Sequence, residues 1–251
     1  MVIAALARRQ KRTAQLLKVR FYSAAKWNAA CCLNQAAPRT NPLQTPRKNL
    51  LATALLGIAW TVSVALGLRI LFNYETTPGQ IGAVPPAWPS ASKIGRSNDR
   101  PTLVMLAHPR CPCTRASISE LAKIMARAQG RMDAYVLFFK PRQSGAAWED
   151  SALRGSAAAI PGVKVLSDVD GVEARRFGAE TSGHTLLFDR DGGLLFSGGI
   201  TQSRGHAGEN AGERAIVSMV NNQPSARAST FVFGCSLGNR SQLGDKARCL
   251  K

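Results

Sequence analysis

The chain has 251 residues, a length that allows one domain with an ordinary hydrophobic core and an appended segment. Apolar residues make up 45% of the sequence, which excludes a chain too polar to fold, and the formal net charge is +18. Basic residues do not form a stripe interleaved with aromatic residues, so we expect no nucleic-acid partner.

The net charge is concentrated before an uncharged stretch. Ten basic residues precede residue 49, and the first acidic residue is Glu75. Leu50 to Leu68 contains no charge, and at about 1.5 Å per residue it approaches the roughly 30 Å hydrocarbon core of a bilayer. The pattern predicts a transmembrane helix over residues 50–72, in contact with lipid, after a basic and disordered leader over residues 1–49.

The basic residues lie on the N-terminal side of the predicted span, and this asymmetry also predicts the topology. It places the N-terminus in the cytoplasm and the C-terminal domain outside it, in the periplasm of a bacterium, as a single-pass inner or plasma membrane protein. A buried soluble helix, a signal peptide, a transit peptide and a mis-annotated start codon remain alternatives at this point.

After the span, residues 73–100 are rich in Pro, Gly and Ser and predict an extended linker. Residues 101–225 then alternate between strand and helix patterns, and residues 226–251 form a tail. Strands are expected at 102–107, 133–139, 163–168, 184–189 and 194–200. Helices are expected at 114–129, within 146–159, around 170–179 and at 212–222. This order predicts an α/β domain with a mixed sheet flanked by helices.

Six cysteines divide into two groups around the predicted span. Cys31 and Cys32 precede it, and four follow it: Cys111, Cys113, Cys235 and Cys249. In an oxidising compartment these four permit two disulfides, whose connectivity the sequence leaves open. A structural pairing of Cys235 with Cys249 is one possibility.

Cys111 lies directly after a predicted strand and before a predicted helix. N–H groups at a helix N-terminus stabilise a thiolate there. The position therefore favours a reactive cysteine, although a structural disulfide or two inert thiols at Cys111 and Cys113 remain possible.

The segment RCPCTRASISELAKI, residues 110–124, resembles the active-site segment of membrane-anchored thioredoxin-like proteins of the TlpA/ResA type. Those proteins have a strand, W-C-x-x-C and a helix of the form R-A-E-x-P-E-L. Residues 163–199 are similar to their later strand, D-x-D-G helix and hairpin with a D-R-D-G turn. The resemblance covers about 100 residues, 101–200, with RedB-type members as the nearest subgroup. It implies a thioredoxin-like fold and makes Cys111 the nucleophile.

The same alignment shows departures from the family pattern. Thr114 occupies the place of the second cysteine, and Cys113 occupies an inner position. Gly183 falls on the family's cis-proline, and His184 follows it in a loop expected near Cys111.

Three interpretations of the cysteines stay open. Cys113 resolves a disulfide formed at Cys111, or Cys111 acts alone with a hydrogen bond from Thr114 and resolution by Cys235 or an external thiol. In the third, Cys111, Cys113 and His184 bind Cu(I), which thiolates and imidazole suit.

The resemblance thus implies a thiol–disulfide oxidoreductase that needs no cofactor. Its expected partners are thiols or disulfides of exported proteins, or a redox donor protein. A copper metallochaperone of thioredoxin fold is the alternative, and a docking protein without turnover is a third possibility.

Overall fold

The computed structural model describes residues 47–145, 148, 150–225 and 227–238. Residues 1–46 of the predicted leader, with Cys31 and Cys32, and the last part of the predicted tail, with Cys249, lie outside these residues. The chain divides into two compact units, Met1–Leu56 and Gly57–Lys251. Of the first unit, the structure describes residues 47–56, which form the start of a helix.

Helix α2 (Arg47–Thr76) contains the apolar run. The most apolar 18 residues within Asn49–Thr76 have a mean hydropathy of 2.0, and none of them is buried. By length and composition this helix can cross a membrane, and it is the one such helix among the described residues. It extends past the predicted range 50–72 at both ends and ends at Thr76, within the predicted linker.

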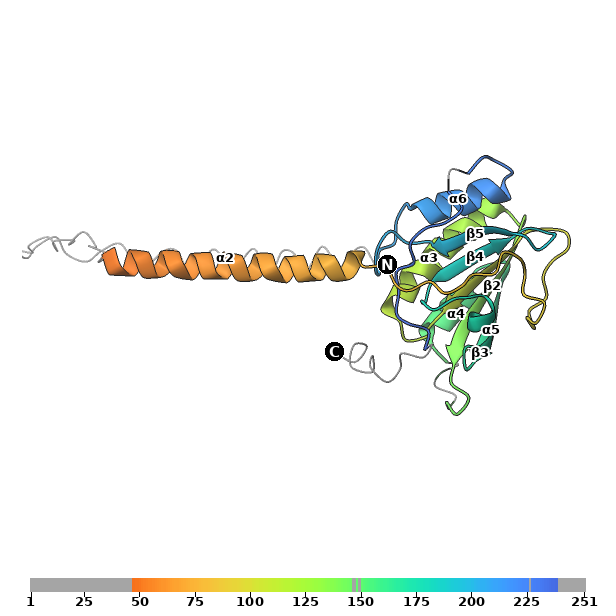
Figure 1. Cartoon of the computed structure of the whole chain (residues 1–251), viewed down its shortest axis with the longest axis horizontal. Helices are drawn as coiled ribbons and strands as arrows, with labels where there is room; N and C mark the ends of the chain where they lie inside the picture. Colours follow the sequence, from red (N-terminus) through yellow and green to blue (C-terminus); the bar gives the residue numbers. More distant parts are fainter. Residues whose placement is uncertain (1–46, 146–147, 149, 226, 239–251) are drawn as a thin grey trace, which may run out of the picture. The chain divides into compact units, whose positions relative to one another are not determined.

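The strands of the domain form one mixed sheet in the order β3-β2-β1-β4-β5 (Figure 1). Strands β1 (Thr102–Ala107), β2 (Asp133–Lys140) and β3 (Val163–Val169) are parallel. Strand β4 (His184–Phe188) pairs antiparallel with β1, and β5 (Leu194–Gly199) pairs antiparallel with β4. The parallel strands and the terminal hairpin are those that the sequence pattern predicts.

Helices cover both faces of the sheet because its central strands are apolar on both sides. Leu103 and Met105 of β1 belong to the core under α3 (Pro112–Ala128), α4 (Ala152–Ala158) and α6 (Ala211–Val220). Val104 and Leu106 belong to the opposite core, which includes residues of α5 (Val172–Arg176). The alternation along β1 therefore divides its side chains between two cores.

The segment predicted as a linker lies against the domain. Trp88 packs edge-on against Phe177 and Phe188, with ring centroids 5.1 and 5.2 Å away. Its backbone N–H donates to the Gly192 carbonyl at 2.7 Å, and Ile94 is buried. This part of the chain completes the core on the α5 face, so it does not act as a simple spacer.

The first part of the predicted tail also belongs to the domain. Val232 is fully buried, and its carbonyl accepts the Gly79 N–H at 2.8 Å. Ser229 forms a parallel bridge to Ser197 of β5, and Ser236 forms an antiparallel bridge to Thr181. These contacts bring Ser229 beside β5 and Ser236 beside Thr181, which lies before β4.

Candidate functional site

Cys111 occupies the N-cap of α3, where β1 passes into the helix. Its backbone is extended (φ −85°, ψ 119°), and Pro112 begins the helix with a fixed φ. The Cys111 N–H donates to the His108 carbonyl at 3.1 Å, which closes the loop. The sulfur therefore lies at the helix end whose unpaired N–H groups favour negative charge, as the sequence predicts.

Cys235 lies beside Cys111, although 124 positions separate the two in the chain. Their Sγ atoms are 3.0 Å apart, and the Cys235 N–H donates to the Cys111 sulfur at 3.4 Å. The Cys235 carbonyl accepts the Ser182 N–H at 2.8 Å, and the Leu237 N–H donates to the Glu180 carbonyl at 2.8 Å. Residues 234–237 are thus held along residues 180–182, which places Cys235 over the helix end.

The Cys113 side chain also contacts the Cys111 sulfur. Hydrogen bonds from the side chains of Cys113 and Cys235 lower the pKa of Cys111 far below its usual range, and they outweigh burial, which raises it. The same bond and burial raise the pKa of Cys113 well above its usual value. The arrangement can therefore hold Cys111 as a thiolate and Cys113 as a protonated donor.

Thr114 uses its hydroxyl to join the loop after β1 to the turn that precedes β4. Its Oγ1 donates to the His108 carbonyl at 3.2 Å and lies 2.8 Å from the Ser182 Oγ. The Ser182 Oγ in turn accepts the His108 N–H at 2.8 Å. Thr114, expected beside the thiolate, thus positions the segment that carries it.

Replacing Ser182 with alanine tests this connection. Ser182 is 1% exposed, and its loss leaves the partly buried His108 N–H without that acceptor. We expect the free energy of unfolding of the reduced protein to fall by about 1–3 kcal/mol, measured by urea denaturation. Ser119→Ala, on the exposed side of α3, is the matched control and should change it by less than about 0.5 kcal/mol. Equal losses in the two variants would contradict the assigned role of Ser182.

Gly183 and His184 have separate roles. Gly183 has a φ of 89°, its N–H donates to the Leu106 carbonyl at 2.7 Å, and an added Cβ would lie 2.9 Å from the Ser117 Oγ. The position therefore favours glycine. His184 is fully buried in β4, where its Nε2 pairs with the Ser197 Oγ at 2.9 Å. Burial lowers the pKa of His184 to about 4, so its ring is neutral.

The copper ligand set is not assembled. Among the residues that the structure describes, no three His, Cys, Asp or Glu side chains form a group that could hold a metal ion. The predicted third ligand, His184, is engaged with Ser197 across the hairpin.

A loop between β5 and α6 approaches the cysteines from another side. The Arg204 Nη1 donates to the Gly234 carbonyl at 2.5 Å, next to Cys235, and the Gly205 N–H bonds Cys113. Glu120 of α3 is fully buried and accepts the Gly208 N–H at 2.8 Å, which fixes the far end of the loop. Sequence reasoning missed Arg204 because nothing in its neighbourhood marks a motif.

A second group of contacts, which the sequence does not predict, surrounds His108. The His108 ring stacks on Phe139 and meets Trp148 edge-on, with centroids 5.8 and 5.7 Å away. The Arg110 guanidinium lies 4.3 Å from the Trp148 ring centroid. This cluster forms an apolar and cationic surface next to the loop between β1 and α3, which carries Cys111.

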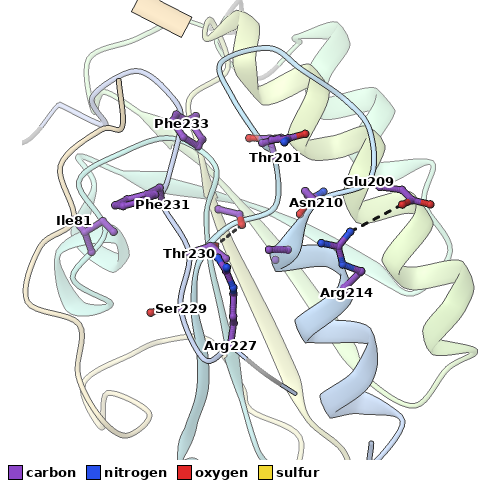
Figure 2. Close-up of a pocket in the computed structure, with 14 residues that line it drawn as sticks. Ile81, Thr201, Glu209, Asn210, Arg214, Arg227, Ser229, Thr230, Phe231 and Phe233 are labelled. Carbon is purple, nitrogen blue, oxygen red and sulfur yellow. Dashed lines mark hydrogen bonds and ion pairs between the residues drawn. The ribbon is translucent and has the colours of Figure 1, made fainter. Parts of the chain in front are cut away.

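The structure also contains a cavity of about 490 Å³ beside the C-terminal segment (Figure 2). Ile81, Phe231 and Phe233 line one side. Arg214 and Arg227 supply positive charge, and Glu209 lies 4.0 Å from Arg214. Phe231 is 68% exposed, and Phe233 lies two residues before Cys235. The cavity thus adjoins the segment that presents Cys235.

The strand order and the N-cap cysteine after β1 define the class: the chain has a thioredoxin-like fold. No protein-family model and no curated protein matches the sequence. Among solved structures, a hypothetical protein from Sinorhizobium meliloti is 17% identical, with 64% of this chain and 97% of that chain covered and a TM-score of 0.49.

Two further solved structures are similar. An uncharacterised conserved protein from Geobacillus kaustophilus is 15% identical, with 65% and 94% of the two chains covered and a TM-score of 0.46. A secreted disulfide oxidoreductase from Mycobacterium tuberculosis is 14% identical, with 50% and 83% covered and a TM-score of 0.36.

Proposed function

We propose that this chain is a membrane-anchored thiol–disulfide oxidoreductase of the TlpA/ResA type, in which Cys111 and Cys235 form the redox pair. The observation that carries the proposal is the 3.0 Å contact between their sulfurs, with the Cys235 N–H also donating to Cys111. Formation of a disulfide between Cys111 and Cys235 needs only a small movement, because hydrogen bonds already hold the two segments together.

The chemistry is exchange between this pair and an external thiol or disulfide. Exchange proceeds through a thiolate that attacks a disulfide sulfur and gives a mixed disulfide. Cys111 has the stabilised thiolate, Cys235 provides the second sulfur, and Cys113 donates a hydrogen bond to the thiolate. No cofactor takes part in these steps.

Helix α2 supports the proposed location. It is long and apolar enough to anchor the chain, and the basic residues before it favour a cytoplasmic N-terminus. The domain then lies in an extracytoplasmic space where disulfides persist, and exported proteins are its partners. The cavity lined by Phe231 and Phe233 supports a polypeptide partner, since it offers apolar and charged surface next to the segment that carries Cys235.

Copper binding remains the second proposal from the sequence. It requires the His184 ring to leave the Ser197 hydroxyl and approach the cysteines. No contact among the described residues favours it over exchange.

Matched cysteine variants test the proposed pair. The full chain in detergent is assayed for exchange with a fluorescent disulfide peptide. Cys235→Ser should reduce turnover to the rate of the blank, since no intramolecular disulfide can then form at Cys111. Cys113→Ser keeps a hydroxyl donor and should retain activity. The reverse outcome, activity in Cys235→Ser and none in Cys113→Ser, would assign the pair to Cys111 and Cys113.

A further inference from the structure

The three described cysteines differ in how far a substrate can reach them. Cys111 is 1% exposed and Cys113 is 6% exposed, whereas Cys235 is partly exposed. Because thiol–disulfide exchange depends on which sulfur is accessible, the two halves of a Cys111–Cys235 disulfide are not equivalent. An incoming thiol meets Cys235 first.

The contacts at the helix end also distinguish the two sulfurs as leaving groups. When a disulfide opens, the bonding electron pair goes to the sulfur that is not attacked. At Cys111 that charge meets the Cys113 side chain, backbone N–H groups and the N-terminus of α3. A sulfur that leaves as a stabilised thiolate leaves faster.

We infer that substrate thiols attack the Cys235 sulfur, that Cys111 departs as the thiolate, and that the chain acts as an oxidant of cysteine pairs in exported polypeptides. This inference rests on the proposed function, and it gives that function a direction. It also reverses the roles expected from the sequence, in which Cys111 carries the mixed disulfide.

The electron and proton balance is complete for a substrate dithiol. A substrate thiolate bonds the Cys235 sulfur, the Cys111–Cys235 bond breaks, and its electron pair stays on Cys111. The second substrate thiol loses its proton, attacks the substrate sulfur of the mixed disulfide and forms the substrate disulfide. Cys235 leaves with the electron pair and takes up that proton. Two electrons pass to the chain, and exchange with a second disulfide compound restores its oxidised form.

The geometry also supports the direction. The groups that bind the Cys111 thiolate act only in the reduced form, because the sulfur carries no charge in the disulfide. Stabilisation of the reduced form makes a disulfide more oxidising. The chain is therefore expected to transfer its disulfide to a peptide dithiol.

The site of attack is tested with the oxidised full chain in detergent, whose Cys111–Cys235 bond is first verified by peptide mapping. An excess of a peptide with one cysteine is added, the reaction is quenched with acid at short times, and remaining thiols are alkylated at low pH. Digestion and mass spectrometry should find the peptide on Cys235 and the alkyl group on Cys111. The peptide on Cys111, or no adduct at either residue, would overturn the inference.

A second experiment tests the direction of electron transfer and the reactivity of two cysteine variants. A peptide dithiol mixed with an equal amount of oxidised chain should become mostly oxidised, and a mixture in which the chain stays oxidised would contradict this. Variants in which one cysteine is replaced are exposed to a peptide with an activated disulfide. Cys111→Ser should form the adduct at Cys235, while Cys235→Ser should react at least tenfold more slowly. Absence of a Cys111–Cys235 bond in the starting material would instead refute the proposed function itself.

Discussion

Replacing Gly234 with alanine is expected to slow formation of the Cys111–Cys235 disulfide by on the order of a hundredfold, because displacements near 1 Å have effects of this size. A Cβ at Gly234 would lie 2.0 Å from the Ser182 carbonyl oxygen. That oxygen belongs to the backbone that pairs with Cys235, so the segment has to move away. The movement separates two sulfurs that now lie 3.0 Å apart.

The rate is measured on the reduced full chain after addition of oxidised glutathione, with acid quench and mass spectrometry. Gly95→Ala is the matched control, since Gly95 is exposed and an added Cβ meets no atom within 4 Å. The control should form the disulfide at the wild-type rate. An unchanged rate in Gly234→Ala would mean that the close seating of residues 234–235 on Ser182 does not position the pair.

Replacing Cys113 with alanine should weaken the Cys111 thiolate. A hydrogen bond to a charged group contributes about 1.5–3 kcal/mol, so its loss should lower the acid dissociation constant of Cys111 about ten- to a hundredfold. Because the pKa of Cys111 is strongly lowered in the fold, wild-type protein should keep its thiolate absorbance near 240 nm as pH falls through the range of an ordinary thiol, about pH 8.5. Cys113→Ala should lose it at a higher pH than wild type.

The lowered pKa of Cys111 also makes the stability of the reduced protein depend on pH. A lowered pKa stabilises the reduced fold above the pKa of the unfolded thiol, and this stabilisation declines as pH falls toward the folded value. Cys113→Ser, which keeps a donor, should behave more like wild type than Cys113→Ala does. Identical titrations for all three proteins would show that Cys113 does not stabilise the Cys111 thiolate.

The positions of β1, α3 and Cys111 follow from local pattern. An apolar run followed by apolar residues three and four apart predicts a strand followed by a helix, expected at residues 102–107 and 114–129. The structure has β1 at Thr102–Ala107 and α3 at Pro112–Ala128. These elements could be predicted because each depends on neighbouring residues.

Contacts between distant segments could not be predicted in the same way. The predicted linker has the composition of a free spacer, yet Trp88 packs against Phe177 and Phe188. Cys235 was one of several possible partners for Cys111, since cysteine counts do not specify pairing. Only the return of residues 227–238 to the sheet brings the two sulfurs together.

The contacts that individual side chains make were also not predictable from the sequence. The sequence does not predict that the ring of His184, which follows Gly183, pairs in β4 with Ser197 across the hairpin. Thr114 was expected to contact the thiolate, and its hydroxyl instead joins His108 and Ser182. Strand register and the path of the loop decide both cases, and neither is visible in a local motif.

The most direct test of the account is a disulfide map of the oxidised full chain. The protein is extracted in detergent with free thiols blocked, digested without reduction and analysed by mass spectrometry. We expect a peptide pair that joins Cys111 to Cys235, with Cys113 alkylated. A Cys111–Cys113 bond, or a Cys235–Cys249 bond with Cys111 alkylated, would contradict it.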